Sequence, residues 1–234
     1  MIKRIITAIS SRIKRSYYKS GFHRNRQIRS YLEQYPVAKL QIGCGPNRLS
    51  GWLNTDISLT ECKKGAVYMN AGEHFPLPDS SIDYIYSEHL FEHLTYSAAV
   101  NMLRECHRVL KPHGVIRIST PDLRFLVDLY ENPSDPLNER FIKWSANGGA
   151  GGEIIPAAPA YVISKFHTTW GHKIIYDYDT LAALLQQFGF NDICQCELNQ
   201  SNHSALQCVE RHHLINSVEF YKLQTMILEA TKSV

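Results

Sequence analysis

The stretch Lys39-Leu40-Gln41-Ile42-Gly43-Cys44-Gly45-Pro46-Asn47 combines a short apolar run with a glycine pair. An aspartate, Asp56, follows shortly afterwards. In α/β nucleotide-binding folds a strand that ends in Gly-x-Gly brings the backbone close to a ligand, because a side chain there would block the approach. Ordinary tight turns also contain Gly-x-Gly, so the motif alone leaves both interpretations open.

The composition is that of a globular protein. The chain has 234 residues, 44% of them hydrophobic and 20% charged, and a formal net charge of +3. This charge is too small to indicate a nucleic-acid partner. Six scattered cysteines without a secretory signal favour reduced thiols, and no apolar run approaches the ~20 residues of a membrane span. We therefore expect a cytoplasmic protein.

Residues 1–36 are predicted to form a basic, amphipathic helical extension. Their isoleucines recur at helical spacing between lysines and arginines, and Pro36 ends the pattern. One interpretation is a helix that packs its apolar stripe on the rest of the chain. The other is peripheral contact of residues 1–16 with anionic lipid at the inner face of the cell membrane.

From residue 37 the pattern alternates between strands and helices. We expect strands at 37–43, 52–57, 66–70, 82–87 and 115–120, and a helix at 97–110. Such an order predicts a mostly parallel, buried sheet with its ligand at the carboxyl ends of the strands. Four segments would then converge on one crevice: Gly43 to Gly45, Asp56, Asn70, and Ser87 to His89.

Residues 121–172 interrupt this regularity. After a predicted helix at 123–130, four prolines and the glycine run at 147–152 break the chain repeatedly. No strand leads into the glycines and no Lys-Ser/Thr follows them, which excludes a P-loop. A flexible loop that acts as an active-site lid or substrate insertion is expected here. Further on we predict a helix at 179–188, a strand at 193–198, a helix at 204–213 and a strand at 223–230.

The glycine motif does not fit a dinucleotide. Such a site needs Gly-x-Gly-x-x-Gly, whose third glycine allows a helix and a strand to pack closely. Arg48 occupies that position, and the gap from Gly45 to Asp56 is too short for a full crossover helix.

Several blocks occur in a specific order: residues 40–45 (LQIGCG), 51–56 (GWLNTD), 75–85 (FPLPDSSIDYI), 87–94 (SEHLFEHL), 105–114 (ECHRVLKPHG), 121–123 (PDL), 170–177 (WGHKIIYD) and 184–190 (LLQQFGF). In these blocks the chain resembles the class I S-adenosylmethionine-dependent methyltransferases, and most of all a bacterial type-11-like branch associated with surface-glycan synthesis. The resemblance implies that residues 37–234 form one methyltransferase domain. Its α/β fold would be a Rossmann-like, seven-stranded, mostly parallel sheet with helices on both faces and a reversed C-terminal β-hairpin.

The same resemblance implies a site for S-adenosyl-L-methionine. Gly43, Cys44 and Gly45 would lie against its methionine portion, and Asp56, followed by Ile57, would accept hydrogen bonds from the ribose hydroxyls. Asn70 and Ala71 occupy the adenine position, where the family usually has an acid. Ser87 and Glu88 would lie under the sulfonium. Gln41 replaces a common acidic residue and is also assigned to the cofactor site.

Transfer of a methyl group to a hydroxyl is helped by a general base, for which histidine is the usual choice. His89 has the best position, at a strand end that faces the crevice, and His172 is the second candidate. We expect no metal site, since the pair His167 and His172 has no carboxylate at a useful spacing. Ser87-Glu88-His89-Leu90 also differs from the Asn/Asp-Pro-Pro-aromatic turn with which nucleic-acid methyltransferases grip a base, so no nucleic acid is expected.

Two functions follow from these patterns. The first is O-methylation of a small-molecule or glycolipid acceptor, most plausibly a sugar hydroxyl in glycan biosynthesis; the sugar rests on family analogy alone. The second is a catalytically silent binding module with this fold, located at a membrane through residues 1–16. The sequence does not predict the oligomeric state.

Overall fold

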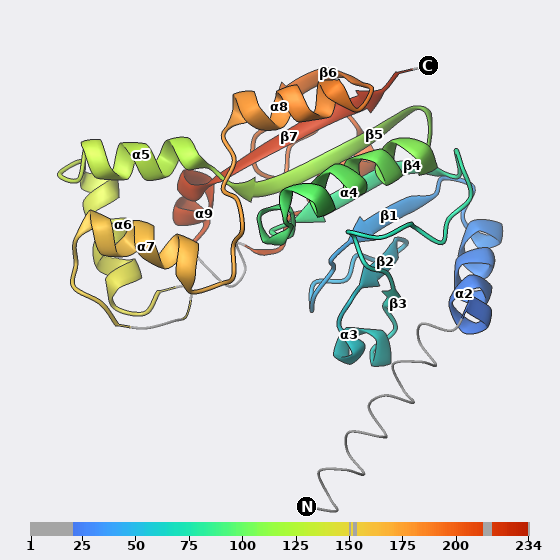
Figure 1. The fold of residues 1–234 in the computed structure, drawn as a ribbon, viewed down its shortest axis with the longest axis horizontal. Coiled ribbons are helices and arrows are strands. Elements are labelled where there is room, and N and C mark those ends of the chain that lie inside the picture. Colours follow the sequence, from blue (N-terminus) through green and yellow to red (C-terminus); the bar gives the residue numbers. More distant parts are fainter. Residues whose placement is uncertain (1–20, 150, 152–153, 213–216, 234) are drawn as a thin grey trace, which may run out of the picture.

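The computed structural model describes residues 21–149, 151, 154–212 and 217–233 (Figure 1). The predicted N-terminal helix over residues 1–20 therefore lies outside the described residues. The first described helix, α2, spans Gly21–Gln34 and ends before Pro36, as predicted. The hydroxyl of Tyr31 in α2 donates to the backbone carbonyls of Lys39 and Gly51, which fixes this helix beside the sheet.

The centre of the structure is a seven-stranded sheet in the order β3-β2-β1-β4-β5-β7-β6. Strands β1 to β5 are parallel, whereas β7 runs antiparallel to both β5 and β6. This confirms the predicted fold class, with β6 and β7 as an antiparallel pair at the C-terminal edge in which only β7 is reversed relative to β1–β5. The strands are β1 (Lys39–Ile42), β2 (Leu53–Asp56), β3 (Val67–Tyr68), β4 (Ile82–Glu88), β5 (Leu110–Pro121), β6 (Phe190–Gln195) and β7 (Thr225–Lys232).

Alternating side chains of the central strands enter different parts of the core. Ile85 and Ile116 belong to the main cluster, into which α4 (Tyr96–Val109) and α8 (Tyr178–Gln187) also pack. Tyr86 and Val115, their neighbours along the chain, join a second cluster with Leu206. Both faces of β4 and β5 are therefore covered, as the apolar runs of these strands require.

The predicted loop at 121–172 is mostly helical, so the expectation of a long flexible loop was wrong for its described part. It contains α5 (Leu123–Glu131), α6 (Pro136–Ala146) and α7 (Pro159–Thr168). With α9 (Val218–Gln224) these helices share their own apolar cluster, which includes Phe141, and they stand together at one end of the sheet (Figure 1). Residues 150 and 152 of the glycine run, and residue 153 after it, lie outside the described part.

Three short elements complete the fold: α3 (Leu59–Lys63) and the 3₁₀ turns η1 (Phe91–His93) and η2 (Ser204–Leu206). The helix predicted at 204–213 was wrong, since only η2 forms there among the described residues. Strand β6 begins at Phe190, three residues earlier than predicted. Helix α9 had no counterpart in the sequence-based prediction.

A buried ion cluster fastens the reversed edge of the sheet. Arg117 of β5 is fully buried, and its guanidinium donates to Glu210 at 2.6 Å and to Glu229 of β7 at 2.5 Å. Two further bonds reach the backbone carbonyls of Glu197 and Gln200. Burial lowers the pKa of Arg117, but the two carboxylates outweigh it and hold the pKa above its ordinary value. The cluster thus ties residues 197–210 to the sheet.

Replacing Arg117 by Met should strongly destabilise the protein, because two buried carboxylates would lose their cation. We expect the free energy of unfolding, measured by urea denaturation, to fall by about 3–5 kcal/mol. Arg140→Met is the matched control: Arg140 pairs with Glu219 on the surface, where an ion pair contributes about 0–1 kcal/mol. Equal losses in the two variants would contradict a structural role for the buried cluster.

Candidate active site

The glycine loop after β1 has the backbone conformation that its sequence predicts. Gly43 and Gly45 have φ angles of +68° and +49°, which side chains disfavour. A Cβ atom on Gly43 would also lie 2.9 Å from the side chain of Leu90. The backbone N–H groups of Cys44, Gly45 and Asn47 already donate within the chain. The loop therefore offers a ligand close approach rather than free amide donors.

Gln41 holds this loop in place. Its side-chain amide donates to the carbonyl of Asn47 at 3.0 Å, while its oxygen accepts the N–H of Leu49 at 3.2 Å. The side chain is almost fully buried, although it touches the wall of the adjacent cavity. An acid at this position has no donor for Asn47, which explains why an amide suits this loop.

Asp56 closes the loop from the neighbouring strand. One carboxylate oxygen accepts the N–H of Gly45 at 2.8 Å, and the other accepts the N–H of Ser58 at 2.7 Å. Each carboxylate oxygen has a second lone pair, so these bonds leave acceptor capacity for a ribose. The contact with ribose stays a prediction, while the support of Gly45 is a role that the sequence did not indicate.

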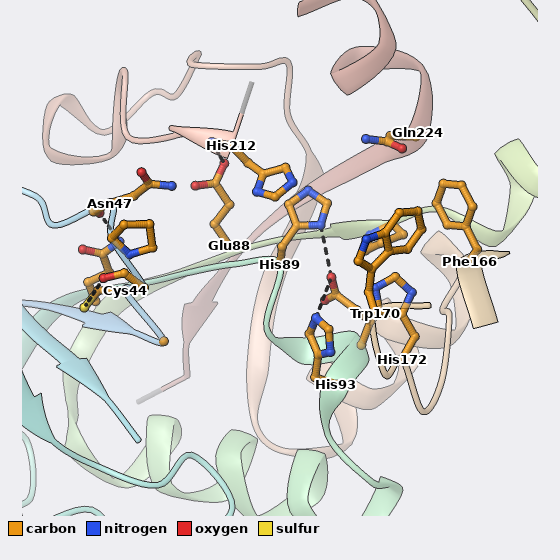
Figure 2. Close-up of a pocket in the computed structure, with 16 residues that line it drawn as sticks. Cys44, Asn47, Glu88, His89, His93, Phe166, Trp170, His172, His212 and Gln224 are labelled. Carbon is orange, nitrogen blue, oxygen red and sulfur yellow. Dashed lines mark hydrogen bonds and ion pairs between the residues drawn. The ribbon is translucent and has the colours of Figure 1, made fainter. Parts of the chain in front are cut away.

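A cavity of about 370 Å³ opens at the carboxyl ends of β1 and β4 (Figure 2). Its volume is within the range of about 300–1,000 Å³ typical of small-molecule sites. One wall is the glycine loop, and the opposite wall carries imidazoles and aromatic rings. Seven of the predicted site residues line it: Gln41, Gly43, Cys44, Gly45, Glu88, His89 and His172.

The other five predicted residues do not line this cavity. Ile57 is about half exposed, and Ala71 is buried. The side chain of Asn70 donates to Glu73 and accepts the N–H of Gly72, as part of a local turn. The hydroxyl of Ser87 is buried and has no hydrogen-bond partner among the described residues. Asp56 lies behind the loop. The cofactor roles of these residues stay predictions.

His89 is held by two neighbours. Its Nδ1 lies 3.1 Å from Oε1 of Glu92, and its Nε2 lies 3.4 Å from the hydroxyl of Thr225. Its ring stacks on His212 with the centroids 4.3 Å apart. The φ angle of His89 is +47°, a strained value for a residue with a side chain, and such strain is frequent at functional sites. The strand end therefore presents one oriented imidazole to the cavity.

Glu92 is the fully buried carboxylate of the site. One oxygen faces His89, and the other accepts the hydroxyl hydrogen of Thr120 at 3.0 Å. Burial raises the pKa of Glu92, but the hydrogen bond and charge of His89 outweigh it, so the pKa lies below its ordinary value. At neutral pH the carboxylate is ionised and acts as an acceptor for the groups around it.

Two further imidazoles of the wall are uncharged at neutral pH. Burial lowers the pKa of His172, and burial together with the charge of His89 lowers the pKa of His212 to about 4. Glu88 accepts the backbone N–H groups of Arg211 and His212, which holds this segment over the cavity. Burial raises the pKa of the Cys44 thiol to about 12, so this cysteine is no nucleophile at neutral pH.

Several residues of the cavity wall were missed by the sequence-based prediction. The sequence-based prediction gave no site role to Glu92 and His93, although they line the cavity with His89. Trp170 and Phe166 come from the interrupted region, where no periodic signal was available. His212 follows η2 and is placed by its backbone bond to Glu88, which no sequence pattern reveals.

The domain assignment follows from this geometry and from comparison with known proteins. Residues 40–118 match the family described as "Methyltransferase domain". This segment contains β1, the glycine loop and β4. The match covers 79 of the 234 residues, and together with the sheet order it supports a class I, S-adenosylmethionine-dependent methyltransferase domain in this chain.

Curated relatives match short parts of the chain. A "Probable S-adenosylmethionine-dependent methyltransferase" of Mycolicibacterium smegmatis is 37% identical over 65 residues, which are 28% of this chain and 24% of the relative. "Malonyl-[acyl-carrier protein] O-methyltransferase 1" of Coxiella burnetii is 37% identical over 82 residues, 34% of this chain and 28% of the relative. The chain thus matches about a quarter of the length of these relatives.

Among solved structures, the chain is similar to a S-adenosylmethionine-dependent methyltransferase from Archaeoglobus fulgidus. The sequence identity is 19%, the similarity covers 90% of this chain and 93% of that chain, and the TM-score is 0.48. In the described part of the chain, no helix has the length and apolar character needed to cross a bilayer.

Replacing Gln41 by Glu should destabilise the glycine loop, since the carbonyl of Asn47 would face a carboxylate in place of an amide donor. We expect the free energy of unfolding to fall by about 1–3 kcal/mol, as measured by urea denaturation. Gln186→Glu on the exposed face of α8 is the control and should change it by less than about 0.5 kcal/mol. A Gln41→Glu variant as stable as the parent would show that the loop does not depend on this amide.

Proposed function

We propose that this protein transfers a methyl group from S-adenosylmethionine to a hydroxyl of a small-molecule acceptor, most plausibly a lipid-linked sugar. The observation that carries the proposal is the cavity, which has the glycine loop on one wall and the oriented His89 on the other. The loop and the cavity fit the cofactor, because bare glycine backbone permits close approach of its methionine portion. When bound, the cofactor supplies an electrophilic methyl group.

The contacts of His89 suit a general base. Its Nδ1 faces the ionised Glu92, so the tautomer that carries the proton on Nδ1 is favoured. Nε2 then keeps its lone pair, which can accept a proton from an acceptor hydroxyl. A carboxylate behind an imidazole also stabilises the imidazolium that forms, as in the catalytic triads of hydrolases.

The acceptor class is supported by the shape and chemistry of the wall. Trp170 and Phe166 offer flat apolar surface beside the imidazoles, with their ring centroids 5.5 Å apart. A sugar has both apolar ring faces and hydroxyl edges, so it can contact both kinds of group. The similarity to an O-methyltransferase of Coxiella burnetii also favours oxygen over nitrogen as the methylated atom.

The second candidate is a binding module that carries out no catalysis. It is favoured by the loop contacts, because both polar atoms of Gln41 and both oxygens of Asp56 already bond to the chain. Such a module would contact an anionic membrane through residues 1–16, which lie outside the described residues.

Isothermal titration with S-adenosylmethionine separates the two candidates. We expect a dissociation constant in the micromolar range for the parent, and at least tenfold weaker binding for Asp56→Asn, whose side chain keeps one acceptor oxygen for Gly45 but loses its charge. Thermal unfolding of the variant controls for the loop. If the parent binds no cofactor at millimolar concentration, the enzymatic proposal fails.

Replacing His89 by Gln should remove the base while the cofactor still binds. We expect release of S-adenosylhomocysteine, measured with lipid-linked sugars as acceptors, to slow by about 10²–10⁴-fold. The affinity for S-adenosylmethionine should stay within about threefold of the parent. His167→Ala is the control, because His167 is exposed on α7 and does not line the cavity. A His89→Gln variant with the parent's rate would exclude His89 as the base.

A further inference from the structure

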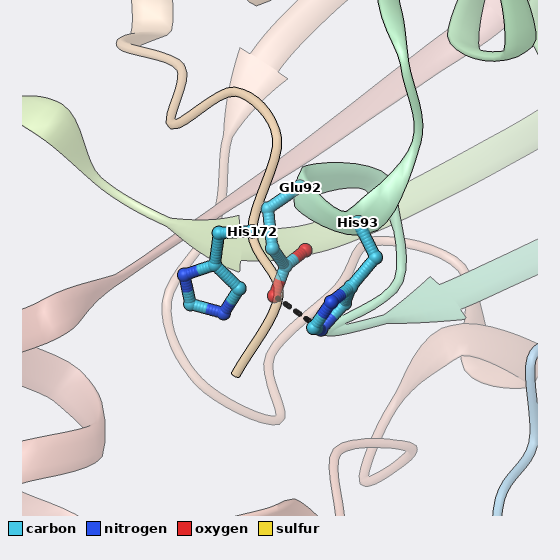
Figure 3. A group of neighbouring side chains, drawn as sticks. All are labelled: Glu92, His93 and His172. Atoms are coloured by element: carbon cyan, nitrogen blue, oxygen red, sulfur yellow. Dashed lines mark ion pairs between the residues drawn. The ribbon is translucent and has the colours of Figure 1, made fainter. Parts of the chain in front are cut away.

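Three potential metal ligands meet on one wall of the cavity (Figure 3). Glu92, His93 and His172 each present a ligand atom, and these atoms all lie within 4.8 Å of one another. All three residues line the cavity. In sequence, His172 was compared only with His167, which lacks a carboxylate neighbour. The fold instead pairs His172 with two residues about 80 positions earlier.

Backbone contacts place the three residues of the group next to one another. Turn η1 places Glu92 and His93 side by side. The backbone carbonyl of Glu92 then accepts the N–H of Lys173 at 2.7 Å, so His172 must lie opposite them. The site is thus formed in advance, which lowers the entropy that a ligand must overcome to order it.

The electrostatics of the group favour a cation. Among the described residues, Glu92 has ion-pair contacts only with the imidazoles of His89 and His93, and with no lysine or arginine. Burying an ionised carboxylate is costly unless a full positive charge compensates it. The Nδ1 atom of His172 is buried and has no hydrogen-bond partner among the described residues. Neutral imidazole is the form that binds metals.

We propose that Glu92, His93 and His172 bind a divalent transition-metal ion of the Zn²⁺ class. Two imidazoles and one carboxylate suit Zn²⁺ better than Mg²⁺ or Ca²⁺, which prefer oxygen ligands. Neighbouring ligands of a tetrahedral zinc ion with bonds of ~2.1 Å lie about 3.4 Å apart. The donor atoms must therefore approach by roughly 1 Å, and His93, with a side chain 34% exposed, has room to rotate.

Three protein ligands would leave at least one coordination position for a ligand in the cavity that the three residues line. Resting on the proposed function, an ion held by these three residues would bind the acceptor oxygen and lower the pKa of its hydroxyl. His89 remains bonded to Glu92 and so orients the carboxylate ligand from behind. The nearby Nε2 of His89 then accepts the hydroxyl proton.

Cobalt titration tests this site without an activity assay, because Co²⁺ bound by two imidazoles and a carboxylate absorbs visible light. The experiment uses the full chain without an affinity tag, stripped of metal with a chelator. It is carried out in a Cys194→Ser/Cys196→Ser background, since Cys194, Cys196 and Glu229 form another group of potential ligands. Zn²⁺ is then added to displace the cobalt.

We expect one equivalent of Co²⁺ per chain in the background protein, displaced by Zn²⁺. His93→Ala and His172→Ala should each weaken binding at least tenfold and alter the spectrum, while His167→Ala should leave both unchanged. Circular dichroism of each variant shows whether it has folded. The proposal is overturned if the background protein binds no Co²⁺, or if folded His93→Ala and His172→Ala variants keep the parent's spectrum.

Titration of the metal-free protein with S-adenosylmethionine keeps the two proposals separate. Cofactor binding without any cobalt site would refute the metal alone. Cobalt binding without cofactor binding would refute the proposed methyl transfer but would still support the metal site.

Discussion

The buried carboxylate of Glu92 connects the parts of the structure that form the candidate active site. Its side chain accepts from Thr120 at the end of β5 and faces His89 at the end of β4. Its backbone carbonyl accepts the N–H of Lys173, which follows the helical insertion. An ionised carboxylate is expensive to bury, so these partners are required for the fold as well as for the site. One residue thereby sets the position of two strand ends and of the following segment.

The position of the cavity follows from the order of the strands. The chain leaves β1 towards β2 and β3 on one side, then returns to β4 on the other side of β1. Such a reversal leaves a crevice at the carboxyl ends of β1 and β4, where no connection crosses. The register places Ile42 beside Ser87, so the glycine loop and His89 emerge from adjacent strands. The helical insertion and residues 211–212 then close the crevice from the far side.

The sequence predicted those parts of the fold that depend on local patterns. The apolar runs located the parallel strands, and the glycine pair located the loop, because both signals arise within a few residues. The prolines of the insertion were misread. Pro136 and Pro159 begin α6 and α7, where a missing N–H costs nothing, but they were interpreted as breaks in the chain. The same residue type has opposite meanings at the first turn and in the interior of a helix.

The site was predictable only where it coincides with a strand end. Gly43 and His89 follow directly from β1 and β4, whereas the approach of His172 to His93 depends on backbone hydrogen bonds between distant segments, from Lys173 and Ile174 to the carbonyl of Glu92. These contacts bring His172 to Glu92, so that its carboxylate can both orient His89 and contribute to the proposed metal site. Oε1 of Glu92 faces both His89 and His93, at 3.1 and 4.0 Å, so a base and a metal would share one acceptor. Replacing Glu92 would affect the orientation of His89 and the metal site at once. Only substitutions of the imidazoles can separate the two roles. Orientation of the proposed base and binding of the proposed ion would therefore be coupled through this one side chain.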